Sequence, residues 1–293
     1  MYPAKIWLLA SRPKTLAAGL TPVLIGSAMA AAAGHFHLAA ALCAALGALL
    51  IQIGTNFAND YFDFVKGTDT EARVGPTRAT QAGLVRPRTM LFATILVFAL
   101  AFLPGAYLVL RGGWPILAIG IVSVACGVLY TGGPYPLGYL GLGDLFVLVF
   151  FGPVAVGGTY YVQALDLPGP VLAAGLMPGL FSTAILTVNN LRDADTDVRT
   201  GKRTLAVRFG KTFARWEYLV CMLAAGIAIP IGLCLLADGH WAALAGGLAL
   251  VPAIPLIRNV FTSADGNVLN QTLAGTGKVL LLFSVLFSIG WLL

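Results

Sequence analysis

Nine long apolar stretches are the feature that most restricts what this chain can fold into. A helix crosses the hydrocarbon core of a bilayer with about 20 apolar residues, and nine stretches come near this length. They cover residues 15–33, 38–62, 90–110, 114–130, 142–163, 170–191, 216–236, 241–261 and 274–293. Transmembrane β-strands alternate polar and apolar residues over about 10 positions, whereas runs such as LAAALCAALGALLIQIG are apolar throughout. The sequence therefore predicts an all-α, polytopic membrane protein with about nine transmembrane helices.

The composition agrees with this prediction and excludes two other classes of protein. Charged residues make up 10% of the chain, against roughly 25% in soluble domains, and the mean hydropathy is +0.87. A soluble protein of this size needs far more polar surface, and intrinsic disorder needs low hydrophobicity. No polar stretch is long enough for a second domain, so we expect one transmembrane domain over residues 1–293. The first apolar stretch is long enough to span and lacks a clear cleavage site, so we expect no removable signal peptide.

The positive charges predict the orientation of the chain. Sixteen of the 18 Lys and Arg residues fall on one side of the predicted spans, Arg111 falls on the other, and Lys278 lies within the last span. Lys and Arg accumulate on the cytoplasmic side of membrane proteins. We therefore expect a cytoplasmic N-terminus and an outside C-terminus. The net charge of +6 follows from this topology and does not indicate a nucleic-acid partner.

The acidic residues are concentrated in two segments at the cytoplasmic ends of predicted spans. Seven of the 12 acids lie in residues 56–83 and 189–210. Side chains three or four residues apart share one face of a helix, so a helix that continues into either segment presents a column of oxygen ligands. The two columns are Asn56, Asp60 and Asp63, and Asn189, Asp193 and Asp197. The motifs are 133 residues apart and both spans run inward, which indicates two related halves, about residues 1–140 and 141–293.

A divalent cation between the columns removes the cost of placing like charges together. Carboxylates at this spacing repel one another, and burying them near lipid is costly. Magnesium takes oxygen ligands and usually binds one or two carboxylates together with substrate phosphates, whereas zinc prefers Cys and His. The three histidines lie on the outer side, and the cysteine spacing matches no metal site. The basic residues beside the acids complete a predicted Mg²⁺–diphosphate site, and they are Lys66, Arg78, Lys202 and Arg203.

A diphosphate site embedded in lipid indicates a substrate with a long apolar tail, since each buried CH₂ group contributes about 0.8 kcal/mol. Allylic diphosphates are such molecules, because metal and basic groups stabilise the departing diphosphate and leave a cationic carbon. Water has to be kept away from that carbon, and an electron-rich aromatic ring is the rational second substrate. We therefore predict that the two columns serve the transfer of an apolar group to an aromatic ring.

Four segments of the sequence resemble motifs of a known family. The strings are SRPKTL, NDYFDFVKGTDT, VGPTRATQAGLV and NNLRDADTDVRTGKRTLAVRFG. Together they resemble the UbiA superfamily of intramembrane aromatic prenyltransferases, and within it the enzymes that prenylate 1,4-dihydroxy-2-naphthoate in menaquinone synthesis. The resemblance implies a helical bundle around a central cavity open to the cytoplasm and laterally to lipid. It also implies Mg²⁺ dependence and transfer of a polyprenyl group from polyprenyl diphosphate to the naphthoate, with loss of CO₂ and diphosphate, giving demethylmenaquinone.

The resemblance also implies roles for individual residues. The catalytic candidates are Asp60, Asp63, Asp193 and Asp197, which together with Asn56 match the metal motifs. The diphosphate-binding candidates are Lys66, Arg78, Lys202 and Arg203. Many relatives carry a third acid where this chain has Gly67, and whether Asp69 replaces it is open. Asp195 points off the helical face of its neighbours and is expected to be solvated or to act behind them.

The acceptor-binding candidates carry alternative interpretations. They are Arg12, Lys14, Gln81, Tyr130, Tyr139, Asn189 and Asn190. Arg12 and Lys14 either meet the naphthoate carboxylate or only anchor the first span. Tyr130 and Tyr139 either line the cavity or anchor helices at the interface, as tyrosines commonly do. Lys278 either snorkels to the cytoplasmic interface or faces the cleft.

Two other functions stay open at this point. One is prenyl transfer to a different ring, such as 4-hydroxybenzoate or homogentisate. The other is transport of an anionic solute, because transporters also place ionisable groups in membrane helices and contain internal repeats. Transporter sites lie near the bilayer midplane, however, whereas these acids cluster at one end. Prenyl chain length and oligomeric state are not predicted.

Overall fold

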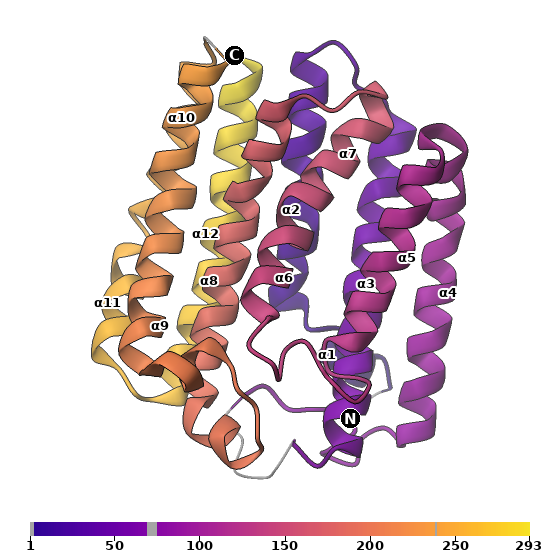
Figure 1. The fold of residues 1–293 in the computed structure, drawn as a ribbon, viewed down its shortest axis with the longest axis vertical. Helices are drawn as coiled ribbons and strands as arrows, with labels where there is room; N and C mark the ends of the chain where they lie inside the picture. Colours follow the sequence, from indigo (N-terminus) through magenta and orange to yellow (C-terminus); the bar gives the residue numbers. More distant parts are fainter. Residues whose placement is uncertain (1–2, 69–74, 238) are drawn as a thin grey trace.

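The computed structural model describes residues 3–68, 75–237 and 239–293, apart from the side chains of Pro3 and Lys14, and within these residues it is helical without strands. Its helices are α1 (Pro3–Ser11), α2 (Pro13–Ala32), α3 (Leu38–Val65), α4 (Pro87–Gly112), α5 (Trp114–Leu129), α6 (Gly143–Val149), η1 (Phe150–Val154), α7 (Ala155–Ala164), α8 (Gly169–Arg199), α9 (Leu205–Leu223), η2 (Ala224–Ala228), α10 (Ile229–Leu236), η3 (Trp241–Leu250), α11 (Ile254–Thr262) and α12 (Gly266–Leu292). The long helices run side by side as a bundle (Figure 1).

The protein is a polytopic membrane protein. Within the described residues, seven segments are long and apolar enough to cross a bilayer: Thr15–Ala32, Leu38–Val65, Pro87–Gly112, Gly143–Ala164, Gly169–Arg199, Leu205–Leu236 and Gly266–Leu292. An eighth results if η3 and α11, bent by 43° at their junction, count as one span. The helix α5 has only 16 residues. The predicted count of nine is therefore not confirmed, because it requires both the bent pair and α5 to cross.

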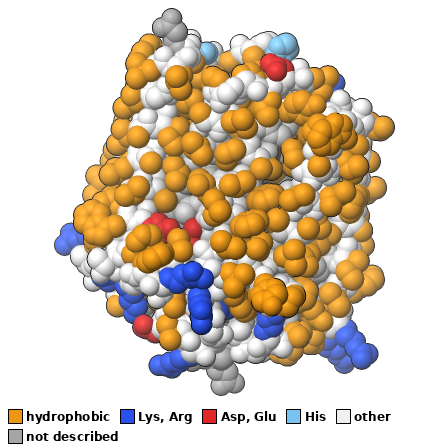
Figure 2. Space-filling model, viewed as in Figure 1, with side chains coloured by type: hydrophobic (Ala, Val, Ile, Leu, Met, Phe, Trp, Pro, Cys, Tyr) orange, Lys and Arg blue, Asp and Glu red, His pale blue; other side chains and the backbone are white. Residues whose placement is uncertain are grey.

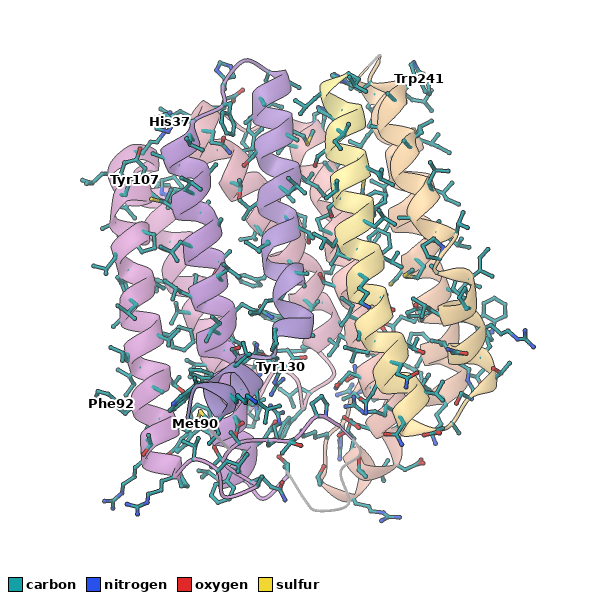
Figure 3. All side chains as sticks on the ribbon, turned by 180° about the vertical axis from the view of Figure 1, so that it is seen from behind. His37, Met90, Phe92, Tyr107, Tyr130 and Trp241 are labelled. Carbon is teal, nitrogen blue, oxygen red and sulfur yellow. The ribbon has the colours of Figure 1, made fainter. Side chains whose placement is uncertain are left out.

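The two termini lie at opposite ends of the bundle (Figure 1). The helices α3 and α8 both end on the side of the N-terminus, so the acid columns share one end of the molecule (Figure 1). On the face shown in Figure 2, most Lys and Arg side chains gather at this end, and hydrophobic side chains cover the surface above it. Figure 3 places Tyr130 toward the same end and His37 and Trp241 at the other.

The helix α8 is the central element of the packed interior. Its buried residues include Met177, Phe181 and Val188, which belong to one hydrophobic cluster with Phe283 and Phe287 of α12. Large apolar side chains are also exposed on the outside of the bundle, as a lipid environment allows. This packing fixes α8 against its neighbours and so fixes the second acid column.

A break between α6 and α7 shapes one wall of the interior. Gly152 leaves helical geometry, with φ −111° and ψ −114°, next to Pro153. An added Cβ at Gly152 would lie 2.7 Å from the carbonyl oxygen of Gly175 on α8, so only glycine permits this close approach. The break presents the aromatic residues before it, Phe146 and Phe150, to the cavity described next.

Candidate active site

A cavity of about 890 Å³ lies between the helices and joins the acid end of the bundle to an apolar interior. The polar residues at the acid end of this cavity are Asn56, Asn59, Asp63, Arg78, Asn189, Asn190, Asp193, Asp197 and Lys202. Deeper in the bundle its wall is formed largely by small or apolar residues such as Ala48, Ile116 and Gly120. Residues of the predicted columns on α3 and α8 thus line the same cavity.

The column on α3 differs from the predicted one at a single position. Neighbouring residues of a helix point about 100° apart, so Asn59 and Asp60 face different surroundings. Asn59 lines the cavity, and its Oδ1 accepts a hydrogen bond from Thr131 Oγ1 at 2.9 Å. Asp60 is absent from the cavity-lining residues that the structure describes. The oxygen-bearing groups of α3 that face the cavity are Asn56, Asn59 and Asp63.

Asp60 instead holds the segment that carries Arg78. Its carboxylate accepts hydrogen bonds from the backbone N–H of Ala79 at 2.9 Å and of Thr80 at 3.0 Å, and only 2% of the residue is exposed. The sequence predicts Asp60 in the metal column; in the structure two backbone amides satisfy its carboxylate, and a role of Asp60 in metal binding stays a prediction. Its side chain positions Arg78 beside Asp63.

Asp63 is the charged centre of the α3 column, with 1% of its surface exposed. Arg78 Nη2 donates to its Oδ2 at 2.8 Å, and the Tyr139 hydroxyl donates to its Oδ1 at 2.6 Å. Thr68 Oγ1 donates to Oδ1 at 3.2 Å, and Lys202 Nζ lies 3.5 Å from the same oxygen. Three segments that are more distant in the sequence, around Arg78, Tyr139 and Lys202, therefore converge with the nearby Thr68 on one carboxylate.

The column on α8 is organised by an arginine that precedes its first acid. Arg192 Nε and Nη2 donate to the two carboxylate oxygens of Asp193 at 2.8 and 2.5 Å. Arg192 also donates to the side-chain oxygens of Asn189 at 2.8 Å and Asn270 of α12 at 2.5 Å, and its side chain is 1% exposed. Asp197 is 8% exposed and lines the cavity one turn further along α8.

Tyr139 connects the two columns through its ring as well as its hydroxyl. Lys202 Nζ lies 4.7 Å from the ring centroid, and Lys66 Nζ lies 5.2 Å from it. An aromatic face attracts ammonium groups at these distances. Desolvation lowers the pKa of Lys66 from its ordinary value; the Asp63 carboxylate opposes this shift and the Lys202 charge adds to it. Lys66 also donates to the Gly133 carbonyl oxygen at 2.8 Å, so it lies at the rim of the site.

Tyr130 and Arg12 both line the cavity beside these groups. For Tyr130 this agrees with the alternative that it lines the cavity, and contact of Arg12 with the acceptor stays a prediction. Lys278 is exposed on α12 and is absent from the described lining residues, which agrees with the snorkelling alternative.

Several predicted residues do not join the cavity. Arg203 is exposed and Gln81 is half-buried, and neither belongs to the cavity lining within the described part of the chain. Asp195 is exposed and forms an ion pair of 2.7 Å with a lysine of α9, in agreement with a solvated position. The side chain of Lys14 and the whole of Asp69 lie outside the described residues.

The donor set fits magnesium that arrives with a diphosphate. Among residues 3–68, 75–237 and 239–293, no group of three or more His, Cys, Asp or Glu side chains is close enough to form a preformed metal cage. Asp63 on one wall and Asp193 and Asp197 on the other are buried carboxylates that line the same cavity. Magnesium usually binds through one or two carboxylates and substrate phosphates rather than an all-protein cage.

Two residues of the site were missed in the sequence. Asn59 was passed over because a register that starts at Asn56 selects Asp60 four residues later; starting from Asp63 and counting back four selects Asn59. Arg192 was counted only as a topology signal. Its position directly before Asp193 carries no periodicity signal, because adjacent residues on a helix point in different directions.

A comparison with known protein families identifies the family of this chain. The UbiA prenyltransferase family matches residues 19–292. The chain belongs to this family. The resemblance in the four motif strings is thereby confirmed, as is the all-α fold class.

Bacterial members of the UbiA family are similar over nearly the whole chain. The 1,4-dihydroxy-2-naphthoate octaprenyltransferase of Escherichia coli is 39% identical over 97% of this chain and 94% of its own. The protein of the same name from Haemophilus influenzae is 36% identical over 99% of this chain and 96% of its own. The one from Mycobacterium tuberculosis is 38% identical over 95% and 94%.

Solved structures of UbiA homologs share the fold at low sequence identity. A homolog from Aeropyrum pernix without ligand is 16% identical, covers 93% of this chain and 96% of its own, and superposes with a TM-score of 0.71. A homolog from Archaeoglobus fulgidus bound to GPP and Mg²⁺ is 14% identical, covers 97% and 99%, and gives a TM-score of 0.62. These proteins show the fold of this chain to be that of the family.

Proposed function

We propose that this UbiA family member transfers a polyprenyl group from polyprenyl diphosphate to 1,4-dihydroxy-2-naphthoate, with loss of CO₂ and diphosphate, to give demethylmenaquinone. The observation that carries the proposal is the cavity with buried carboxylates and basic groups at one end and an apolar wall at the other. The charged end of the cavity suits the diphosphate group of a polyprenyl diphosphate, and the apolar end suits its hydrocarbon chain. The acceptor follows from the names of the bacterial relatives, which are 36–39% identical.

The basic residues of the site hold the departing diphosphate. Arg78 and Lys202 lie on opposite sides of Asp63, at 2.8 and 3.5 Å from its two oxygens. A planar guanidinium can bind a phosphate through two parallel hydrogen bonds, and an ammonium adds a compact charge. Arg78 is buried and Lys202 is partly buried, and both are already oriented at Asp63, so little reorganisation is needed when negative charge grows on the leaving oxygen.

The acid columns are proposed to hold Mg²⁺ through Asn59, Asp63, Asp193 and Asp197. When bound, the metal neutralises the charge that the diphosphate gains as the allylic C–O bond breaks. Without substrate, Arg78 and Arg192 neutralise Asp63 and Asp193 through short ion pairs. The columns therefore avoid mutual repulsion in the absence of a ligand, and Arg78, which lines the cavity, is placed to bind the phosphates.

The apolar part of the cavity protects the cationic carbon. Water would capture an allylic cation before the ring could attack it. A wall rich in residues such as Ala48, Ile116 and Gly120 leaves space for a prenyl chain and offers water few hydrogen-bond partners. The chain of the substrate itself then fills the route by which water would enter.

We place the site at the cytoplasmic face of the inner membrane of a bacterial cell, with the N-terminus inside and the C-terminus outside. The distribution of Lys and Arg supports this orientation, as does the position of the termini at opposite ends of the bundle (Figure 1). Both substrates carry anionic groups that would reach the basic end of the cavity from the cytoplasm.

A comparison of acceptors tests the proposal. Membranes that contain the protein are mixed with a polyprenyl diphosphate, Mg²⁺ and either the naphthoate, 4-hydroxybenzoate or homogentisate. We expect a prenylated, decarboxylated product with the naphthoate only. Product with 4-hydroxybenzoate and none with the naphthoate would contradict the proposed acceptor, and solute uptake into proteoliposomes without a lipid product would contradict the proposed reaction.

A further inference from the structure

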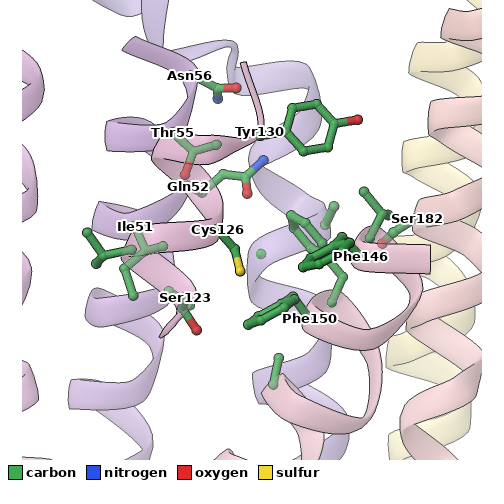
Figure 4. Close-up of a pocket in the computed structure, with 18 of the residues that line it drawn as sticks. Ile51, Gln52, Thr55, Asn56, Ser123, Cys126, Tyr130, Phe146, Phe150 and Ser182 are labelled. Atoms are coloured by element: carbon green, nitrogen blue, oxygen red, sulfur yellow. The ribbon is translucent and has the colours of Figure 1, made fainter. Parts of the chain in front are cut away.

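Polar side chains interrupt the apolar wall of the cavity one helical turn beyond the acid end. Gln52 of α3 precedes Asn56 by four residues, which is about 6 Å along the helix. Gln52 and Ser123 of α5 project from one side of the space, while Ser182 of α8 lies on the other (Figure 4). An apolar prenyl chain gives no hydrogen bond to any of these groups.

Ser182 has no hydrogen-bond partner within the described residues, although it is only 4% exposed. Hydroxyl groups inside helices commonly donate to a carbonyl oxygen one turn earlier. On the same helix Thr183 donates to the Gly179 carbonyl oxygen at 3.0 Å, and Thr187 donates to that of Thr183 at 2.9 Å. Ser182 does not do so; the residue belongs to the cavity wall, and its hydroxyl oxygen is almost fully buried there. A buried hydroxyl without a hydrogen bond destabilises the folded protein, unless a ligand supplies the missing hydrogen bond.

A pair of stacked rings lies beside Ser182. The centroids of Phe146 and Phe150 are 6.0 Å apart and their planes differ by only 6°. Both rings line the cavity opposite Gln52 and Cys126 (Figure 4). A planar aromatic guest gains from contact with such rings beyond the area that it buries.

We propose that Phe146, Gln52 and Ser182 form the binding site for the ring of the aromatic acceptor. The inference rests on the proposed function and extends it, since it names the residues that recognise the second substrate. The ring of 1,4-dihydroxy-2-naphthoate packs on Phe146, and its two hydroxyl groups, at opposite edges of the ring, bind Gln52 on one side and Ser182 on the other. The prenyl chain lies in the deeper part of the cavity.

The position of this acceptor site suits the reaction. It is adjacent to the turn of α3 that carries Asn56 and Asn59, where the cavity passes from polar to apolar. The first carbon of the prenyl chain must lie there if the diphosphate is held by Arg78 and Lys202. A ring on Phe146 would then present a carbon to it. Arg12 lines the same cavity, and we propose that it meets the carboxylate of the acceptor.

Kinetics of three variants test the proposal. Gln52→Leu and Ser182→Ala each remove a hydrogen bond to the acceptor, and Phe146→Leu removes the ring contact. We expect each to raise the KM for the naphthoate by about tenfold, which corresponds to the loss of one such contact. The KM for the prenyl diphosphate should change by less than about twofold. Phe92→Leu is the matched control, because Phe92 of α4 is 66% exposed and points away from the bundle (Figure 3).

Direct binding gives a second readout that does not depend on turnover. The naphthoate is titrated against each detergent-solubilised variant without prenyl diphosphate, and thermal unfolding confirms that the variant is folded. Weaker naphthoate binding in the three variants, with Phe92→Leu unchanged, supports the site. Unchanged naphthoate affinity, or a rise in the KM for the prenyl diphosphate instead, overturns it while the proposed function stands. Failure of the unsubstituted protein to prenylate the naphthoate would overturn the function itself.

Discussion

The sequence predicts the same metal-binding role for Asp60 and Asp63 of α3. We expect their neutral variants, Asp60→Asn and Asp63→Asn, to differ in turnover and in Mg²⁺ dependence. Asp63 lines the cavity between Arg78 and Lys202, whereas Asp60 accepts two backbone hydrogen bonds away from it. In Asp60→Asn the amide oxygen accepts one of those bonds but the amide N–H₂ faces the other donor. Loss of one hydrogen bond to a charged acceptor costs about 1.5–3 kcal/mol. We expect this loss to lower the free energy of unfolding by destabilising the conformation of residues 78–80.

The magnesium dependence of turnover separates the two variants. Asp63→Asn removes a buried charge from the site of the departing diphosphate, and we expect kcat to fall on the order of 10²–10³-fold, with a higher Mg²⁺ concentration for half-maximal rate. Asp60→Asn should lower the thermal stability and leave that Mg²⁺ concentration unchanged. Purified variants in detergent, assayed over a Mg²⁺ series, give both values. An equal shift of the Mg²⁺ dependence in the two variants would refute the assignment of Asp60 to the Arg78 segment.

Three further predictions follow from individual contacts. Tyr139→Phe keeps the ring beside Lys202 but removes the donor to Asp63, so kcat/KM for the prenyl diphosphate should fall about tenfold; a change below twofold would contradict a positioning role. Gly127→Ala places a Cβ inside contact distance of Thr55 Oγ1 and should lower the thermal midpoint by several degrees, and an unchanged midpoint would show that α3 and α5 can separate. Removal of divalent ions with a chelator should abolish product formation, and added Mg²⁺ should restore it; full activity in the chelator would exclude the metal role of the acid columns.

The class of fold was predictable from the sequence because membrane burial imposes a strong local signal. Each span needs about 20 apolar residues in succession, and the expected stretches at 38–62, 90–110 and 274–293 correspond to α3, α4 and α12. The number of membrane-spanning helices was not predictable in the same way, because α5 is short and the pair η3 and α11 is bent. Breaks of this kind depend on tertiary packing, as at Gly152 against Gly175.

The candidate site was predictable at the level of segments but not of every side chain. The pattern of acids placed Asp63, Asp193 and Asp197 correctly in one cavity, since a helical period fixes which residues share a face. It could not choose between Asn59 and Asp60, which flank the line through Asn56 and Asp63 on either side. That choice depends on where residues 78–80 pack. The relation between the two halves of the chain stays a prediction.

The central claim is that one cavity transfers a polyprenyl group to a dihydroxynaphthoate with the help of Mg²⁺. Mass spectrometry of the lipid product, formed by purified protein from defined substrates, measures this directly. The account predicts a single product whose mass equals the naphthoate plus the prenyl group minus CO₂, formed with Mg²⁺ and absent without it. A prenylated product that retains the carboxylate, or an unchanged naphthoate beside hydrolysed prenyl alcohol, would contradict the account.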